Sequence, residues 1–199
     1  MRGWPFGDLP AWHFGVIAAD PPWHFETRTP EGEGRSPQAQ YDTMELDEIC
    51  ALPVADLAKR DSVLLLWFSS PLLEHAQTVM RAWGFRYGAM AHWGKQTRDG
   101  KRFKRGTGYV VGSTAESIMI GLRGRPALPG NSCPNLIAGD GDLLCAPRRE
   151  HSRKPDGFHE WAEDYWRGPY LELFARRSDL HPLWSFWGNQ ADKFNRRDA

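Results

Sequence analysis

Short apolar runs separated by polar and amphipathic stretches make up this chain, and that alternation is typical of an α/β fold. Continuous apolar runs of this length are typical of strands that are buried on both faces of a sheet. They predict four strands, at residues 14–19, 62–68, 87–93 and 117–122. A later apolar block predicts a strand, a turn and a second strand within residues 170–190.

Apolar residues at helical spacing predict the helices between these strands. One helix is predicted to begin near Glu45, a short one to cover residues 54–58, and longer ones to cover residues 71–83 and 157–166. Gly84 follows the third of these, where a C-cap glycine is expected. The order of elements therefore predicts a sheet with helices packed on it.

Three stretches lack the apolar positions that a core needs. Residues 24–40 are rich in Pro, Gly, Glu, Arg and Ser, and we expect a mobile loop there, a functional lid more readily than an insert. Residues 95–108 predict a basic loop, with six cations between residues 95 and 105 against the single acid Asp99. That charge run fits a solvated loop or a loop that contacts phosphates. Residues 126–142 are also predicted to be loop.

Composition places the chain among ordinary globular proteins. Its 199 residues, 41% hydrophobic and 25% charged, predict a single domain over residues 1–199 with a sizeable core. The formal net charge is zero, so any binding to nucleic acid must come from local patches. Three cysteines without Cys-x-x-Cys spacing argue against a disulfide framework and a zinc site. Without a membrane-length apolar run or a signal-peptide core, we expect a cytoplasmic protein.

The first strand ends in Asp20-Pro21-Pro22-Trp23, a carboxylate followed by two prolines and an indole. Neither proline can donate a ladder hydrogen bond, so the strand stops and Asp20 lies at its carboxyl end, where open α/β sheets bind ligands. A carboxylate and the Pro21 carbonyl could accept the two N–H groups of an exocyclic amine and free its lone pair for attack, while Trp23 stacks on the base. In the structural alternative, Asp20 caps a turn and Trp23 fills the core.

From Ala19 to Trp23, the chain resembles the signature of the MT-A70 family of S-adenosylmethionine-dependent adenine N6-methyltransferases. Further resemblances follow in the family's order and extend the match to about residues 14–193. They are Tyr41-x-Thr43-Met44, Trp93-x-Lys95, the glycine-aromatic turn before Glu116, Ser152-x-Lys154-Pro155, Glu172-Leu173-Phe174-x-Arg176 and Trp184-x-x-x-Gly188-Asn189-Gln190. For Trp93 and Lys95, an edge-strand tryptophan and a solvated lysine remain an equal alternative.

The resemblance implies a role for each matched residue. The implied catalytic residues are Asp20, Pro21, Pro22 and Trp23. In the family, the lysine contacts the methionine carboxylate of S-adenosylmethionine and the Asn-Gln pair holds its ribose hydroxyls. The implied cofactor-binding residues are Asp20, Lys154, Arg176, Ser178, Asp179, Asn189 and Gln190. With the basic run included, the expected substrate-binding residues are Tyr41, Trp93, Lys95, Lys101, Arg102, Lys104, Arg105, Tyr109 and Glu116.

The chain also departs from the family pattern. Ser178 and Asp179 stand where family members often carry histidine or asparagine, and residues 1–13 do not align with the acidic element that grips the cofactor adenine in some members. The catalytic motif comes first and the cofactor motif last. The resemblance therefore implies a Rossmann-like methyltransferase sheet with permuted motif order.

The implied function is methyl transfer from S-adenosylmethionine to N6 of adenine in nucleic acid. The compact size resembles a bacterial or phage enzyme of low or short sequence specificity, which favours DNA over RNA. A catalytically silent partner subunit and a plain nucleic-acid-binding domain remain alternatives. The expected partner is nucleic acid, with no membrane contact, and a homodimer could complete the nucleic-acid groove.

Overall fold

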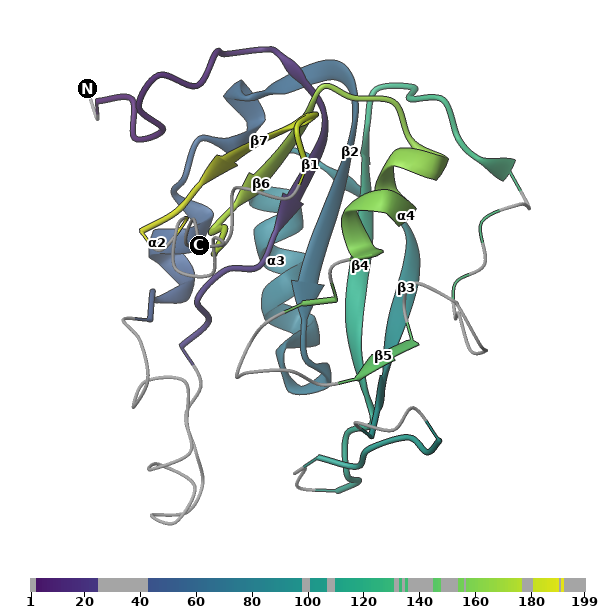
Figure 1. The fold of residues 1–199 in the computed structure, drawn as a ribbon. Helices are drawn as coiled ribbons and strands as arrows, with labels where there is room; N and C mark the ends of the chain where they lie inside the picture. The colour runs from purple at the N-terminus through teal and green to yellow at the C-terminus, as the bar shows by residue number, and fades with distance from the viewer. Residues whose placement is uncertain are drawn as a thin grey trace, which may run out of the picture.

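A seven-stranded sheet forms the centre of the computed structural model, with strand order β5-β3-β4-β2-β1-β6-β7 (Figure 1). The strands are β1 Phe14–Ala19, β2 Ala58–Phe68, β3 Arg86–Gln96, β4 Ala115–Arg123, β5 Cys145–Pro147, β6 Tyr170–Leu173 and β7 Trp184–Trp187. The structure describes residues 3–24, 43–97, 101–106, 110–130, 133, 135, 145–147, 154–155, 157–176, 181–189 and 191. The α/β architecture that the sequence predicts is confirmed.

Strand direction gathers the ends of the strands at one edge of the sheet. β4 runs antiparallel to its neighbours β2 and β3, and every other pairing is parallel. The register aligns Ala19 of β1 with Leu173 of β6, and Leu173 with Trp187 of β7. The residues that follow these three strands therefore lie next to one another at the carboxyl edge, where open α/β sheets bind ligands.

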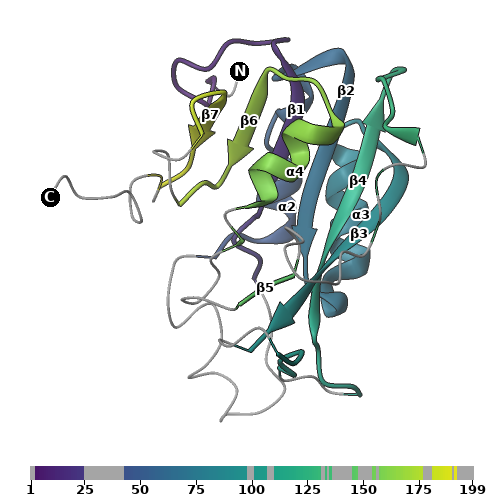
Figure 2. The same ribbon diagram turned by 45° about the vertical axis from the view of Figure 1, so that its right-hand side comes forward.

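Helices cover both faces of the sheet (Figure 2). α2 (Leu46–Cys50) and α3 (Leu73–Ala82) pack on one face, and α4 (Gly157–Tyr165) packs on the other. Successive β1 side chains alternate between the two cores, so that Ile17 joins the cluster under α3 and Val16 the cluster under α4. All six residues of β1 are buried, as a central strand requires.

The core under α4 is rich in tryptophan. Trp67 of β2 packs edge-on against Phe158 of α4 at a centroid separation of 5.1 Å. Trp161 and Trp166 pack on each other at 4.9 Å, and Tyr170 stacks on Trp184 at 5.0 Å. These large, stiff side chains pack α4 against the sheet, and Phe158 holds the start of the helix against β2.

Several element boundaries differ from the sequence-based prediction. β3 continues to Gln96, so the first two residues of the predicted basic loop, 95 and 96, belong to a strand. The predicted helix over 54–58 is a 3-10 turn, Val54–Asp56, and Ala58 already begins β2. β5 escaped prediction because its three residues are too few to show a hydrophobic pattern.

Other local predictions are confirmed. A short 3-10 turn, Ser70–Leu72, leads into α3, and Gly84 follows the helix with φ at +78°, a backbone conformation that favours a glycine C-cap. β1 has the predicted bounds. The predicted mobile loop lies, from residue 25 onward, outside the described residues.

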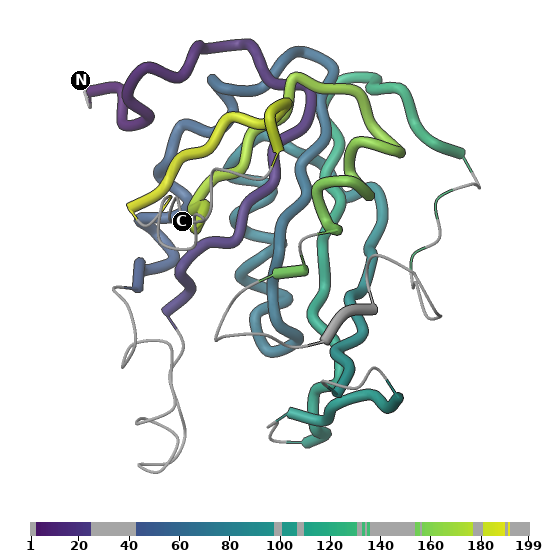
Figure 3. Tube along the Cα trace, in the orientation of Figure 1, coloured from purple at the N-terminus to yellow at the C-terminus, as the bar shows by residue number. Residues whose placement is uncertain are grey.

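The N-terminal segment runs along the outside of the sheet before it enters β1 (Figure 3). Phe6 from this segment is 1% exposed and packs edge-on against Trp187 of β7 at 5.1 Å. In the described part of the chain, none of the helices has the length and hydropathy needed to cross a membrane.

Candidate active site

Asp20 directly follows β1 and lies at the carboxyl edge of the sheet. The prolines after it form a fixed turn, in which the Trp23 N–H donates to the Pro21 carbonyl at 2.8 Å and the Met44 N–H donates to the Pro22 carbonyl at 2.8 Å. The Pro21 carbonyl thus already accepts one hydrogen bond. Its second lone pair is the one that an amine N–H could use.

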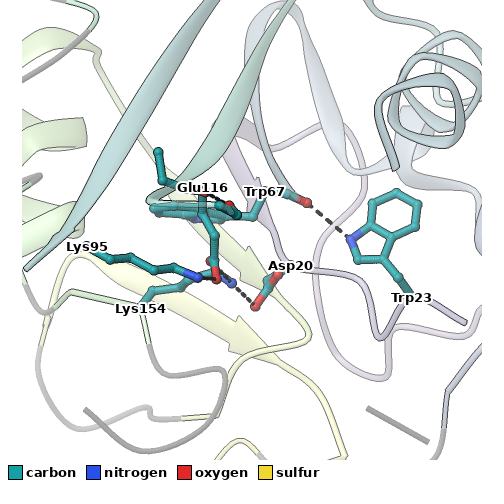
Figure 4. Close-up of polar contacts among 8 residues, drawn as sticks. Asp20, Trp23, Trp67, Lys95, Glu116 and Lys154 are labelled. Carbon is teal, nitrogen blue, oxygen red and sulfur yellow. Dashed lines mark hydrogen bonds and ion pairs between the residues drawn. The ribbon is translucent and has the colours of Figure 1, made fainter. Parts of the chain in front are cut away.

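Trp23 fills the core in this structure. Its side chain is 8% exposed and belongs to the cluster under α2 and α3. Its indole N–H donates to the Trp67 carbonyl at 3.2 Å, which ties the turn after β1 to the end of β2 (Figure 4). With 8% of its surface exposed, the ring does not fit the predicted stacking on a base. It fits the core-filling alternative.

An ion-pair network connects Asp20 to two lysines (Figure 4). The Lys154 Nζ lies 2.8 Å from Asp20 Oδ2 and 3.0 Å from Glu116 Oε2. The Lys95 Nζ lies 2.6 Å from Glu116 Oε1. The four residues come from the end of β1, from β3, from β4 and from the segment before α4, so only the folded sheet brings them together.

The protonation of the two carboxyl groups differs because their surroundings differ. Burial raises the pKa of Asp20 above its ordinary value, and the Lys154 ammonium offsets only part of that effect. Burial acts in the same direction on Glu116, but the ammonium groups of Lys154 and Lys95 outweigh it and lower the pKa of Glu116 to about 2. Burial alone would lower the pKa of Lys154, but its two carboxylate partners raise it above its ordinary value. The two carboxylates therefore favour the charged form of Lys154.

This arrangement gives Asp20 a defined chemical capacity. Lys154 contacts Oδ2, which leaves Oδ1 as the oxygen that can accept an N–H from a bound molecule. The fixed cation holds the carboxylate in one orientation and favours its ionised form. Asp20 is thus a positioned hydrogen-bond acceptor at a ligand-binding edge.

Lys154 and Lys95 have partners that the sequence did not predict. Lys154 was expected to contact the cofactor's carboxylate, and in this structure its ammonium lies between Asp20 and Glu116. Lys95 is paired with Glu116 and only 20% exposed, so it is not the solvated lysine of the alternative. Glu116, expected among the substrate-binding residues, is the acid that joins the two lysines.

Trp93 is a core residue. It is 2% exposed and packs edge-on against Trp67 at a centroid separation of 6.3 Å. The predicted contact between Trp93 and substrate does not fit this burial, and neither does the edge-strand alternative, since β5 pairs with the end of β3. Lys95 Nζ lies 5.7 Å from the Trp93 ring centroid, so the indole supports the lysine instead.

The residues after β6 and β7 fit the S-adenosylmethionine that the sequence motifs associate with them. Arg176 is half-buried three residues after β6, and Asn189 is exposed in the turn after β7. A Cβ at Gly188 would lie 2.8 Å from the backbone N and O of Ala175, so the two strand ends approach closely only with glycine there. A cation and an amide beside the Asp20 edge suit a ligand that carries a carboxylate and a ribose diol.

Not every predicted site residue can be placed. Tyr41, Tyr109, Ser178, Asp179 and Gln190 lie outside the described residues. Lys101, Arg102, Lys104 and Arg105 are exposed and follow β3 at the same edge as Asp20. Their placement agrees with a role in binding phosphates, which stays a prediction.

One polar pair near the site was missed by sequence reasoning. The His159 Nε2 of α4 lies 2.6 Å from Glu172 Oε2 of β6, and the His159 ring stacks on His181 at 4.3 Å. The Glu172 carboxylate acts to raise the pKa of Asp20, so it belongs to the same electrostatic environment. Glu172 lies in a motif that the sequence had singled out, but nothing in the spacing of His159 pointed to it.

Comparison with known proteins gives a consistent result. The family model of MT-A70 matches residues 14–190. An N(6)-adenosine-methyltransferase MT-A70-like protein of Arabidopsis thaliana is 31% identical over 179 residues, 89% of this chain and 24% of that protein. The N(6)-adenosine-methyltransferase catalytic subunit METTL3 of Homo sapiens is 28% identical, over 90% of this chain and 28% of that protein.

For a bacterial relative, the match covers most of both proteins. The type II methyltransferase M.MunI of Mycoplasma is 28% identical over 92% of this chain and 80% of its own length. By contrast, the chain spans about a quarter of the length of the plant relatives it matches. MT-A70 methyltransferases use S-adenosyl-L-methionine.

Proposed function

The chain belongs to the MT-A70 family, and we propose that it transfers the methyl group of S-adenosylmethionine to N6 of adenine in DNA. The observation that carries this proposal is Asp20, a carboxylate at the carboxyl edge of the sheet, held by Lys154 at 2.8 Å, beside a proline-fixed carbonyl. A silent binding subunit would have no need of a positioned acceptor there.

The residues of this chain activate the amine. Asp20 Oδ1 accepts one N6 hydrogen and the second lone pair of the Pro21 carbonyl accepts the other, which draws the nitrogen lone pair out of the ring. Pro22 fixes the turn that aims both acceptors, and Trp23 anchors that turn to β2 through the Trp67 carbonyl. Holding the amine in near-attack geometry supplies most of the rate enhancement. The proton that leaves N6 is accepted by Asp20 or passes to water.

Two groups at the neighbouring strand ends, together with Lys154 before α4, would hold the cofactor. Arg176 and Asn189 suit its carboxylate and its ribose hydroxyls, and Lys154 has a third ammonium N–H beyond the two that its carboxylate partners use. When bound, S-adenosylmethionine supplies an electrophilic methyl group on a sulfonium.

The choice of DNA rests on the comparison of lengths. One relative, which this chain matches over 80% of its length, is named a type II methyltransferase and not an adenosine-methyltransferase. The N(6)-adenosine-methyltransferases are matched over about a quarter of theirs. RNA is the competing substrate, because the Arabidopsis thaliana N(6)-adenosine-methyltransferase relative is 31% identical against 28% for M.MunI, over similar shares of this chain, 89% and 92%.

The test is methyl transfer from labelled S-adenosylmethionine to single- and double-stranded DNA and RNA, followed by nucleoside digestion. We expect N6-methyladenine from DNA, with Asp20→Asn reducing the rate by about 100-fold or more, because the amide cannot replace the charged acceptor. Glu74→Gln, which changes an exposed carboxylate on α3, is the matched control and should leave the rate unchanged.

The other outcomes separate the alternatives. Methylated RNA without methylated DNA would reverse the substrate assignment. Cofactor binding without any product would favour the silent partner subunit, and DNA binding without cofactor binding would favour a plain nucleic-acid-binding domain. Activity that survives Asp20→Asn would remove Asp20 from the mechanism.

A further inference from the structure

A short lobe follows the carboxyl end of β3 and lies at the lower end of the view in Figure 1. Its described residues are 101–106 and 110–114. Gln96 of β3 and Phe103 form an antiparallel bridge. The Thr97 N–H donates to the Arg102 carbonyl at 2.8 Å, and the Lys104 N–H donates to the Lys95 carbonyl at 2.7 Å. The backbone around Phe103 is therefore paired with the strand that carries Lys95.

Phe103 is nevertheless 53% exposed. Val110 and Val111, on the second stretch of the lobe, are 84% and 76% exposed. An aromatic ring held in place by backbone hydrogen bonds yet open to water has an apolar surface available to a partner. The lobe thus presents apolar side chains that the fold itself does not use.

The charge of the lobe indicates which partner fits. Phe103 is flanked on both sides by exposed cations, namely Lys101, Arg102, Lys104 and Arg105. The described stretches 101–106 and 110–114 contain no acid. Exposed cations interleaved with an aromatic ring suit a single nucleic-acid strand, because phosphates pair with the cations and every base has a face that can stack.

Strand alternation separates Phe103 from the reacting edge. Lys104 lies opposite Lys95, so both point to the face of the sheet that carries Glu116. Phe103 lies opposite Gln96 and points to the other face. Phe103 therefore does not meet the adenine at Asp20. It lies on the lobe that follows the carboxyl end of β3, at the edge of the sheet that carries Asp20.

We propose that Phe103 stacks on a base next to the target adenine, while the cations around it hold the flanking phosphates. This inference rests on the proposed function, since it takes the target to be a base in a nucleic-acid strand. A base that stacks on Phe103 must be unstacked from its neighbour, so the lobe favours single-stranded or locally opened DNA.

The test measures binding of a short single-stranded oligothymidylate with one central adenine to the full chain, by fluorescence anisotropy. Phe103→Ala should weaken binding by roughly 5- to 150-fold, the loss of one stacked base, without changing the salt dependence. Phe103→Trp should restore the affinity. Tyr87→Ala is the matched control, since Tyr87 is also 53% exposed but lies at the opposite end of β3.

An abasic site placed in turn at each neighbour of the adenine locates the stacked base. At one position, the abasic site should weaken binding by the wild-type chain and not by Phe103→Ala. Equal losses for both chains at every position would overturn the proposal. So would wild-type affinity in Phe103→Ala, or a change in sedimentation that shows the lobe joins two copies of this chain.

The assay needs no methyl transfer, so the two proposals can fail separately. Methylation that is independent of Phe103, with binding also unchanged, would refute the stacking role and leave the proposed function intact. Binding that depends on Phe103 and the neighbouring base, without methylation of any substrate, would refute the proposed reaction and support the stacking role.

Discussion

Lys95 and Lys104 are joined by a backbone hydrogen bond of 2.7 Å, yet their side chains differ in exposure and in their acidic neighbours. Lys95 is 20% exposed and lies 2.6 Å from Glu116, whereas Lys104 is exposed on a stretch without acids. The aromatic residues differ in the same way. Trp23, at the buried edge, is 8% exposed, and Phe103, on the lobe, is 53% exposed.

The difference shows how one residue type can serve two purposes. A lysine that is paired in a buried network fixes the charge and orientation of a neighbouring carboxylate. A lysine without a nearby acid remains available to phosphates, and its contribution is screened by salt. The buried edge is thus suited to chemistry and the lobe to affinity, and the changes below test that separation.

The largest effect is expected from Lys154→Met, which leaves Asp20 and Glu116 buried without their shared cation. We expect a loss of about 3 kcal/mol in the free energy of unfolding, the size typical of a broken buried pair. Urea denaturation measures it. Lys104→Met, on the lobe, should change the stability by less than about 0.5 kcal/mol. Equal effects of the two substitutions would contradict the separation.

The next effect is a pH dependence of stability that comes from Glu116. Its pKa is about 2 in the folded chain and 4.5 in the reference state, so its ionised form stabilises the fold above pH 4.5. That contribution is lost as the pH falls from 4.5 toward 2, and it amounts to on the order of 3 kcal/mol.

Asp20 acts in the opposite direction, so a control variant is needed. Because the pKa of Asp20 is raised, its ionisation costs stability as the pH rises above 3.8. The difference in urea midpoint between Asp20→Asn and the double variant Asp20→Asn/Glu116→Gln isolates the Glu116 contribution, because the Glu116 charge also raises the pKa of Asp20. It should be constant above pH 4.5 and shrink at lower pH, and a constant difference throughout would show that the two lysines do not hold Glu116 ionised.

Trp23→Phe tests the assignment of Trp23 to the core. The substitution removes the N–H that donates to the Trp67 carbonyl and leaves that carbonyl buried without its partner. We expect the unfolding free energy to fall by about 1 to 2 kcal/mol and the affinity for single-stranded DNA to stay the same. Weaker DNA binding at unchanged stability would restore the stacking role for Trp23.

The smallest effect compares the two lysines in DNA binding. Lys104→Met should reduce the slope of log affinity against log salt by about 0.7, one phosphate contact on a single strand. Lys95→Met should leave the slope unchanged, because its ammonium is already paired with Glu116. An equal reduction for both would mean that Lys95 leaves the network to bind phosphate.

Local sequence patterns were sufficient for the central strands. Six consecutive buried residues in β1, ended by two prolines, defined both the strand and the position of Asp20 at its carboxyl end. Gly84 likewise marked the end of α3, because a C-cap there needs a positive φ. These features depend on residues that are close in the sequence, and so their pattern is visible without a fold.

Partners of charged and aromatic side chains could not be determined in the same way. Glu116 is 96 residues from Asp20 in the sequence. The antiparallel β4 brings Glu116 to the end of β1, and the segment before α4 brings Lys154 there. The Asp-Pro-Pro-Trp motif allowed an exposed or a buried indole, and the packing of β1 against α2 and α3 decided for burial. The sequence by itself determined which residues end the strands. Only the tertiary structure decided which charges are paired and which rings are exposed, because those depend on neighbours supplied by distant segments.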